Sequence, residues 1–162
     1  MADPTAELSP LEIEAWIVSW LNESKEIYDA LGAAQLGGGK VFRLFVPTSE
    51  ALPAITCRRR STSRGKTTRG ADGLATAIFE LRVWNKSDDT AGTELAVARY
   101  IRDKVNGHQG RQGNHAVREC WLEDEYDEDE GTAFDDGVVA LARVLVLKVT
   151  YRETTRQLIG GG

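Results

Sequence analysis

The sequence predicts an α+β domain in which two helices pack on one face of a single, mostly antiparallel five-stranded sheet. Segments with the alternation typical of strands fill most of the chain, and two segments with helical apolar spacing interrupt them in the order α-β-β-β-α-β-β. A chain of 162 residues is long enough for one core. We therefore expect one domain over residues 10–153, with flexible ends at 1–9 and 154–162.

The first helix is predicted to begin at the segment SPLE, residues 9–12, in which the serine and the glutamate form a capping box. Packing of an amphipathic helix accounts for its two tryptophans better than a role as stacking platforms. One further helical turn is expected to end at Gly32. The apolar face of the helix is formed by Ile13, Trp16, Ile17, Trp20 and Leu21.

Two strands are expected next, at residues 41–46 and 54–61, and a long loop follows them. Residues 61–73 read STSRGKTTRGADG, a composition that predicts a mobile loop. This basic arm can meet phosphates or the carboxylates of a neighbouring subunit, whereas base-specific recognition of nucleic acid is the less favoured use. The candidate interface residues at the end of the second strand and in the arm are Arg58, Arg59, Arg60, Arg64, Lys66 and Arg69.

The third strand, at residues 75–85, alternates regularly. Its apolar face is predicted to carry Ala77, Phe79, Leu81 and Val83. The opposite face carries Ile78, Glu80, Arg82 and Trp84, of which Arg82 and Trp84 are further candidate interface residues. The second helix follows, with its apolar stripe predicted at Ala91, Leu95, Ala98, Ile101 and Val105.

The fourth and fifth strands are predicted at residues 115–123 and 138–152, after a glycine-rich loop at 107–114. The fifth strand is apolar on both faces, so both faces need a cover. Two helices in one chain cover only one side of the sheet. The other side is therefore expected to meet another subunit, which predicts a homo-oligomer.

Residues 123–136 read EDEYDEDEGTAFDD, with nine carboxylates and no base. We expect a long, solvated hairpin connection, since the order of residues does not match a calcium loop and adjacent acids on such a loop do not make a catalytic pair. The function that remains is electrostatic: attraction of a basic partner, or repulsion of DNA that slides past. Asp127, Glu128, Asp129 and Glu130 complete the candidate interface.

No residue is predicted to be catalytic, to ligate a metal or to bind a cofactor. The nearest approach to a metal-dependent nuclease pattern is Glu80-Leu81-Arg82, in which an arginine stands where a lysine is needed. The two cysteines, Cys57 and Cys120, fit no metal-ligand spacing and are expected to be reduced thiols. A disulfide between them would require neighbouring strands. No apolar run is long enough to span a membrane.

Four segments together resemble the tail terminator (tail completion) proteins of long-tailed bacteriophages. They are the N-terminal helix leading to ALG…VFRLFVP…ALPAITC, the strand ATAIFELRVWNKS, the helix TAGTELAVARYIRDKVNG and the closing strand ALARVLVLKVTYRE. The resemblance spans about residues 10–153 and is a pattern of elements rather than a catalytic signature. The basic arm at 61–73 and the acidic stretch at 123–136 lie outside the pattern.

The resemblance implies a structural, non-enzymatic role in the virion tail or neck, assembled in the host cytoplasm. Six copies would form a ring at the head-proximal end of the tail tube, end tube growth and meet the head connector or stopper, while DNA passes through without sequence-specific binding. The expected partners are therefore copies of itself, the tube protein and the connector, with no membrane and no cofactor. Another ring component of the neck or tube, or a metal-dependent nuclease, is the alternative.

Overall fold

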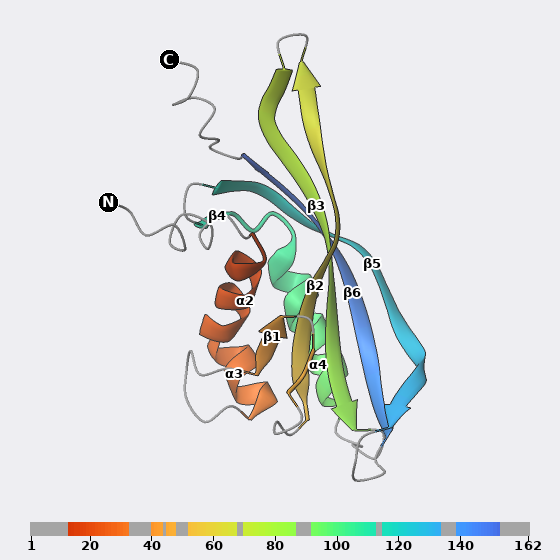
Figure 1. The fold of residues 1–162 in the computed structure, drawn as a ribbon. Helices are drawn as coiled ribbons and strands as arrows, with labels where there is room; N and C mark the ends of the chain where they lie inside the picture. Colours follow the sequence, from red (N-terminus) through yellow and green to blue (C-terminus); the bar gives the residue numbers. More distant parts are fainter. Residues whose placement is uncertain are drawn as a thin grey trace, which may run out of the picture.

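The computed structural model describes residues 13–32, 40–43, 45–47, 52–67, 70–86, 92–112, 115–133 and 139–152. These residues form three helices and one six-stranded sheet (Figure 1). The α+β class is confirmed. In chain order the elements are α2 (Ile13–Glu23), α3 (Lys25–Leu31), β1 (Val41–Arg43), β2 (Ala54–Thr67), β3 (Gly70–Lys86), α4 (Thr93–Val105), β4 (Gly110–Gln112), β5 (His115–Ala133) and β6 (Val139–Arg152).

The strands lie in the order β1-β2-β3-β6-β5-β4. β1 pairs with β2 in parallel and the other four pairings are antiparallel, so the sheet is mixed. The predicted counts of five strands and two helices are wrong for the described residues. The sixth strand, β4, is a three-residue strand inside the expected loop 107–114, and the expected extra helical turn is the separate helix α3.

All three helices lie on one face of the sheet (Figure 1). The predicted alternation of β3 is confirmed, because Ala77, Phe79, Leu81 and Val83 are all fully buried beneath the helices. The predicted apolar stripe of α4 is wrong at one position. Leu95 is 49% exposed, and Val97 of the same helix is buried instead. Ala91 and the expected helix start at 9–12 lie outside the described residues.

The prediction of a mobile loop at 61–73 is wrong for the residues that the structure describes. β2 continues to Thr67 and β3 begins at Gly70, so the two strands form a long hairpin that extends past the helices (Figure 1). Small polar residues suggested a loop, but the ladder between two strands satisfies the backbone whatever the side chains are. Threonines also favour extended backbone. Residues 68 and 69 lie outside the described part.

The acidic stretch is likewise a strand as far as Ala133, and residues 134–136 lie outside the described part. β5 runs beside β6 with Asp127 opposite Arg143 and Glu128 opposite Ala142. The prediction of a hairpin connection over 123–136 is therefore wrong. Basic side chains on β6, β3 and α4 pair with these acids and offset the mutual repulsion of the carboxylates, a compensation that the local sequence does not reveal.

Candidate interaction surface

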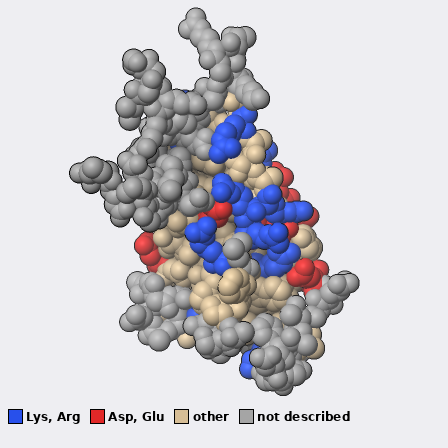
Figure 2. Space-filling view, in the orientation of Figure 1, with Lys and Arg blue, Asp and Glu red and all other residues tan. Residues whose placement is uncertain are grey.

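The sheet face opposite the helices carries no covering element in the described part of the chain (Figure 1). Residues opposite one another in an antiparallel pair point to the same face, so the register assigns side chains to this open face. Lys and Arg gather over β2 and β3, and Asp and Glu lie toward the side of β5 (Figure 2). The open face is therefore divided by charge.

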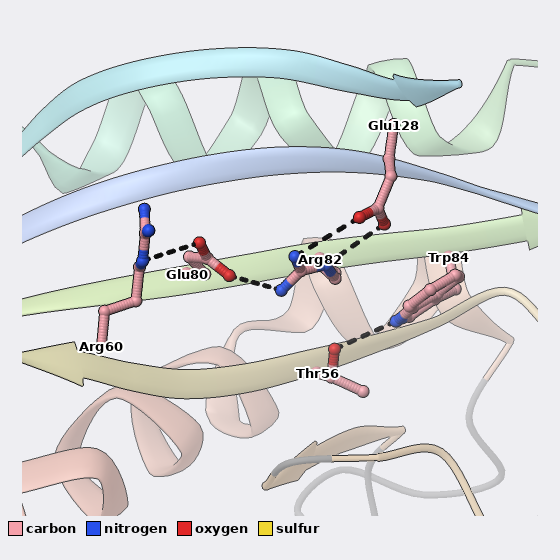
Figure 3. A network of polar contacts seen from close by, with 6 residues as sticks. All are labelled: Thr56, Arg60, Glu80, Arg82, Trp84 and Glu128. Atoms are coloured by element: carbon pink, nitrogen blue, oxygen red, sulfur yellow. Dashed lines mark hydrogen bonds and ion pairs between the residues drawn. The ribbon is translucent and has the colours of Figure 1, made fainter. Parts of the chain in front are cut away.

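Glu80 is the centre of an ion-pair network on this face (Figure 3). Its carboxylate lies 3.0 Å from Nε of Arg60 and 2.5 Å from Nη1 of Arg82. Arg82 also reaches Glu128, with its Nε 3.3 Å from Oε2 and its Nη2 3.5 Å from Oε1. The Glu80 side chain is only 8% exposed, so its charge depends on these two arginines.

The contact between Arg82 and Glu128 bridges two strands that are not neighbours. Arg82 lies on β3, Glu128 on β5, and β6 runs between them (Figure 3). Burial lowers the pKa of Arg82, but the hydrogen bonds to Glu128 and Glu80 outweigh it and leave the pKa above its ordinary value. The guanidinium is therefore a permanent cation held across β6.

This network explains the burial of β6 on the open face. Ala142, Val144 and Val146 have exposures of 3%, 0% and 8%. The register places them between β3 and β5, beside the long side chains of Arg82 and Glu128. Burial of β6 on this face therefore does not by itself require another subunit, because the stems of long polar side chains also exclude water.

Other acids of β5 are paired on the helix side of the sheet. Arg143 of β6 lies 3.2 Å from Glu125 and 2.8 Å from Asp127, and Arg102 of α4 lies 3.1 Å from Glu125. The hydrogen bond to Asp127 raises the pKa of the Arg143 guanidinium, and its effect is larger than that of burial, which lowers the pKa. The sequence suggested that all the acids of this stretch are solvated alike. The ion pairs of Glu125 and Asp127 show that they are not.

The structure brings only part of the predicted interface together. Arg59 turns to the helix side, with its Nε 3.0 Å from a carboxylate oxygen of Glu14 on α2, and Arg64 lies opposite the buried Ala75. The backbones of Lys66, Asp129 and Glu130 belong to strands but their side chains lie outside the described part, as does all of Arg69. Those that share the open face are Arg58, Arg60, Arg82, Trp84 and Glu128.

Trp84 is fixed rather than free on this face, because its Nε1 donates a hydrogen bond to Oγ1 of Thr56 at 3.0 Å (Figure 3). Two aromatic residues that the sequence analysis missed lie on the same face. Trp121 is 45% exposed and Tyr126 is 38% exposed, and the register places them beside Lys148 and Val144. Simple alternation continued from Leu122 would have placed Tyr126 on the helix face, and the bulge between Leu122 and Asp124 turns it to the open face instead.

A second aromatic group lies on the helix side. Trp16 and Trp20 of α2 stack on His108, with ring centroids 5.3 Å and 4.4 Å from the imidazole. Burial lowers the pKa of His108. The amphipathic-helix prediction holds for Trp16, which is buried, while Trp20 is partly buried beside the core.

Replacing Gly110 with alanine should destabilise the fold by about 1–3 kcal/mol, the usual range for overpacking. A Cβ at this position would overlap Nε1 of Trp16 and lie 3.0 Å from its Cε2. The ring is stacked on His108 and has little room to move. Thermal unfolding measures the loss, and a Trp16→Phe background should reduce it. Equal melting temperatures for Gly110→Ala and wild type would contradict the prediction.

The described residues contain no group of three or more His, Cys, Asp or Glu side chains placed to hold a metal ion. Cys57 on β2 and Cys120 on β5 are separated by β3 and β6, a distance of about 14 Å at the usual strand spacing. They cannot form a disulfide with each other. Burial raises the pKa of each thiol to about 12. None of the described helices has the length and apolarity needed to cross a membrane.

No family model matches the chain, and no curated protein matches it. One similar solved structure aligns over 91% of this chain and 96% of its own length, with 13% sequence identity and a TM-score of 0.46. At that identity and TM-score the likeness assigns neither a family nor a function.

Proposed function

We propose that this chain is a structural, non-enzymatic protein of the virion of a long-tailed bacteriophage, a tail terminator that forms a ring at the head-proximal end of the tail tube. The observation that carries the proposal is the open face of the sheet. It is broad and divided by charge, and its ion pairs hold Arg60, Arg82 and Glu128 in place. Such a face suits contact with other proteins better than the chemistry of a small substrate.

The four segments that carry the sequence resemblance support the same proposal. Apart from residues outside the described part, they form α2, the end of α3, β1, the start of β2, most of β3, α4 and most of β6, which build much of the sheet and of the helical layer that covers it. The resemblance thus belongs to one packed unit. The ring of six copies, the tube protein and head connector as partners, and the passage of DNA remain part of the proposal.

Tube assembly tests the function. Tail-tube protein from the same phage is polymerised with and without the purified chain, and tube lengths are measured by electron microscopy. A terminator should bind at one end of each tube and stop its growth. Incorporation along the whole tube would instead identify a tube component. Magnesium-dependent cleavage of DNA by the pure protein would identify a nuclease, and either result would overturn the proposal.

A further inference from the structure

Two long strand edges have no neighbouring strand in the part of the chain that the structure describes. β1 covers β2 only at residues 55–57, which leaves the outer edge of β2 open over 58–67. β4 and the turn after α4 bond to β5 as far as Leu122, which leaves its edge open over 123–133. An open edge presents backbone N–H and C=O groups that can pair with another strand.

The two open edges have opposite charge. The β2 edge carries five basic residues and no acid, while the β5 edge carries seven acids and no base. Intrachain pairs offset part of this charge, as between Arg60 and Glu80. Exposed charges remain on both edges, because Arg58 and Asp124 form no ion pair with another described residue.

Charge decides which edges can meet. Two β2 edges, or two β5 edges, would place like charges opposite one another, which destabilises strand pairing. A β2 edge and a β5 edge attract each other. Each edge therefore disfavours a second copy of itself and accepts the other edge.

The topology fixes the direction of such a pairing. From β2 through β3 and β6 to β5, each neighbour is antiparallel to the last, so β2 and β5 run in opposite directions within one sheet. A second copy in the same orientation would have its β2 antiparallel to the first copy's β5. Because the registers align Cys57 with Glu125 across the sheet, the two open stretches lie at opposite ends of it, and the second copy must be shifted along the strands for them to pair. A contact between two different surfaces always leaves one unused surface at each end of a row of copies. Further copies can therefore add until the row closes into a ring or grows into an open filament.

We infer that copies of this chain join head to tail through their sheets, with the basic β2 edge of one copy paired to the acidic β5 edge of the next. This contact deepens the proposed function, and rests on it only for the closure of the copies into a ring. It names the surface between subunits and the partner, a second copy of this chain.

Cross-linking between two marked variants tests the contact. A tagged Arg64→Cys chain and an untagged Asp124→Cys chain are mixed with a short bis-maleimide, because antiparallel pairing of residues 58–67 with 123–133 brings these two positions near each other. The buried thiols of Cys57 and Cys120, with pKa values of about 12, should react slowly. The matched controls are Arg99→Cys and Asp103→Cys, which place the same two residue changes at exposed positions of α4.

The expected result is a mixed dimer of the two edge variants that exceeds both same-variant dimers and the α4 control. It should weaken between about 0.1 M and 1 M salt, as the Debye length falls from about 10 Å to about 3 Å. Dimers within one variant that equal the mixed dimer, or monomers at every concentration, would overturn the inference. The assay needs no tail tube, so its outcome is independent of the tube-capping test.

Discussion

Replacing Leu147 with alanine is expected to lower the free energy of unfolding by about 3–4 kcal/mol, as truncation of a fully buried leucine usually does. Leu147 lies on the helix face of β6 with no exposed surface. The register places it between Phe79 of β3 and Leu122 of β5. Neighbours on both sides are held in strands and cannot close in, so a cavity would remain.

Urea unfolding measures this loss as a lower midpoint at an unchanged slope. The matched control is Leu141→Ala on the same strand. Leu141 is 41% exposed, so its truncation removes less buried surface and should cost much less. Equal losses at the two positions would show that the core does not lie where the structure places it.

Replacing Arg82 with alanine is expected to cost about 2–3 kcal/mol, somewhat less than the loss of a partner from a fully buried ion pair. The change leaves Glu80, which is nearly buried, with Arg60 alone. It also removes the stem that helps to cover Val144 on the open face. At about 2–4 °C per kcal/mol, the melting temperature should fall by several degrees.

Two further variants separate the parts of this effect. Arg82→Met keeps an apolar stem and loses the charge, so it isolates the contribution of the ion pairs. Arg58→Ala removes an exposed arginine of the adjacent strand and should change stability by no more than about 0.5 kcal/mol. If Arg82→Ala were as mild as Arg58→Ala, the network would contribute nothing to the fold.

The α+β class and the helix side of the sheet were predictable because they depend on local periodicity. Phe79 and Leu81 alternate with Glu80 and Arg82, and that pattern alone assigns the two faces of β3. Glu80 and Arg82 were also predicted to share the opposite face of that strand. Their contacts with Arg60 and Glu128 were not predicted, because these residues meet through the order of four strands.

The basic stretch in β2 and the acidic stretch in β5 were mispredicted because their structure also depends on partners that lie outside each stretch. Residues 61–67 and 123–133 have compositions typical of loops, but each lies beside a long partner strand that satisfies its backbone. The acids of β5 also find bases far away in the sequence, as Glu125 does in Arg102 and Arg143. Local composition does not reveal pairings with such distant residues.

The bridge between Arg82 and Glu128 has a consequence for how this sequence can change over time. The two side chains meet above β6 near Ala142 and Val144, which are small enough to leave room for them. A bulky residue at position 142 or 144 would push the two bridging side chains apart, and loss of the bridge would expose the small residues on β6 to water. Substitutions at the four positions should therefore occur together: among related sequences, a large apolar residue on β6 should accompany shorter or uncharged residues on the two flanking strands.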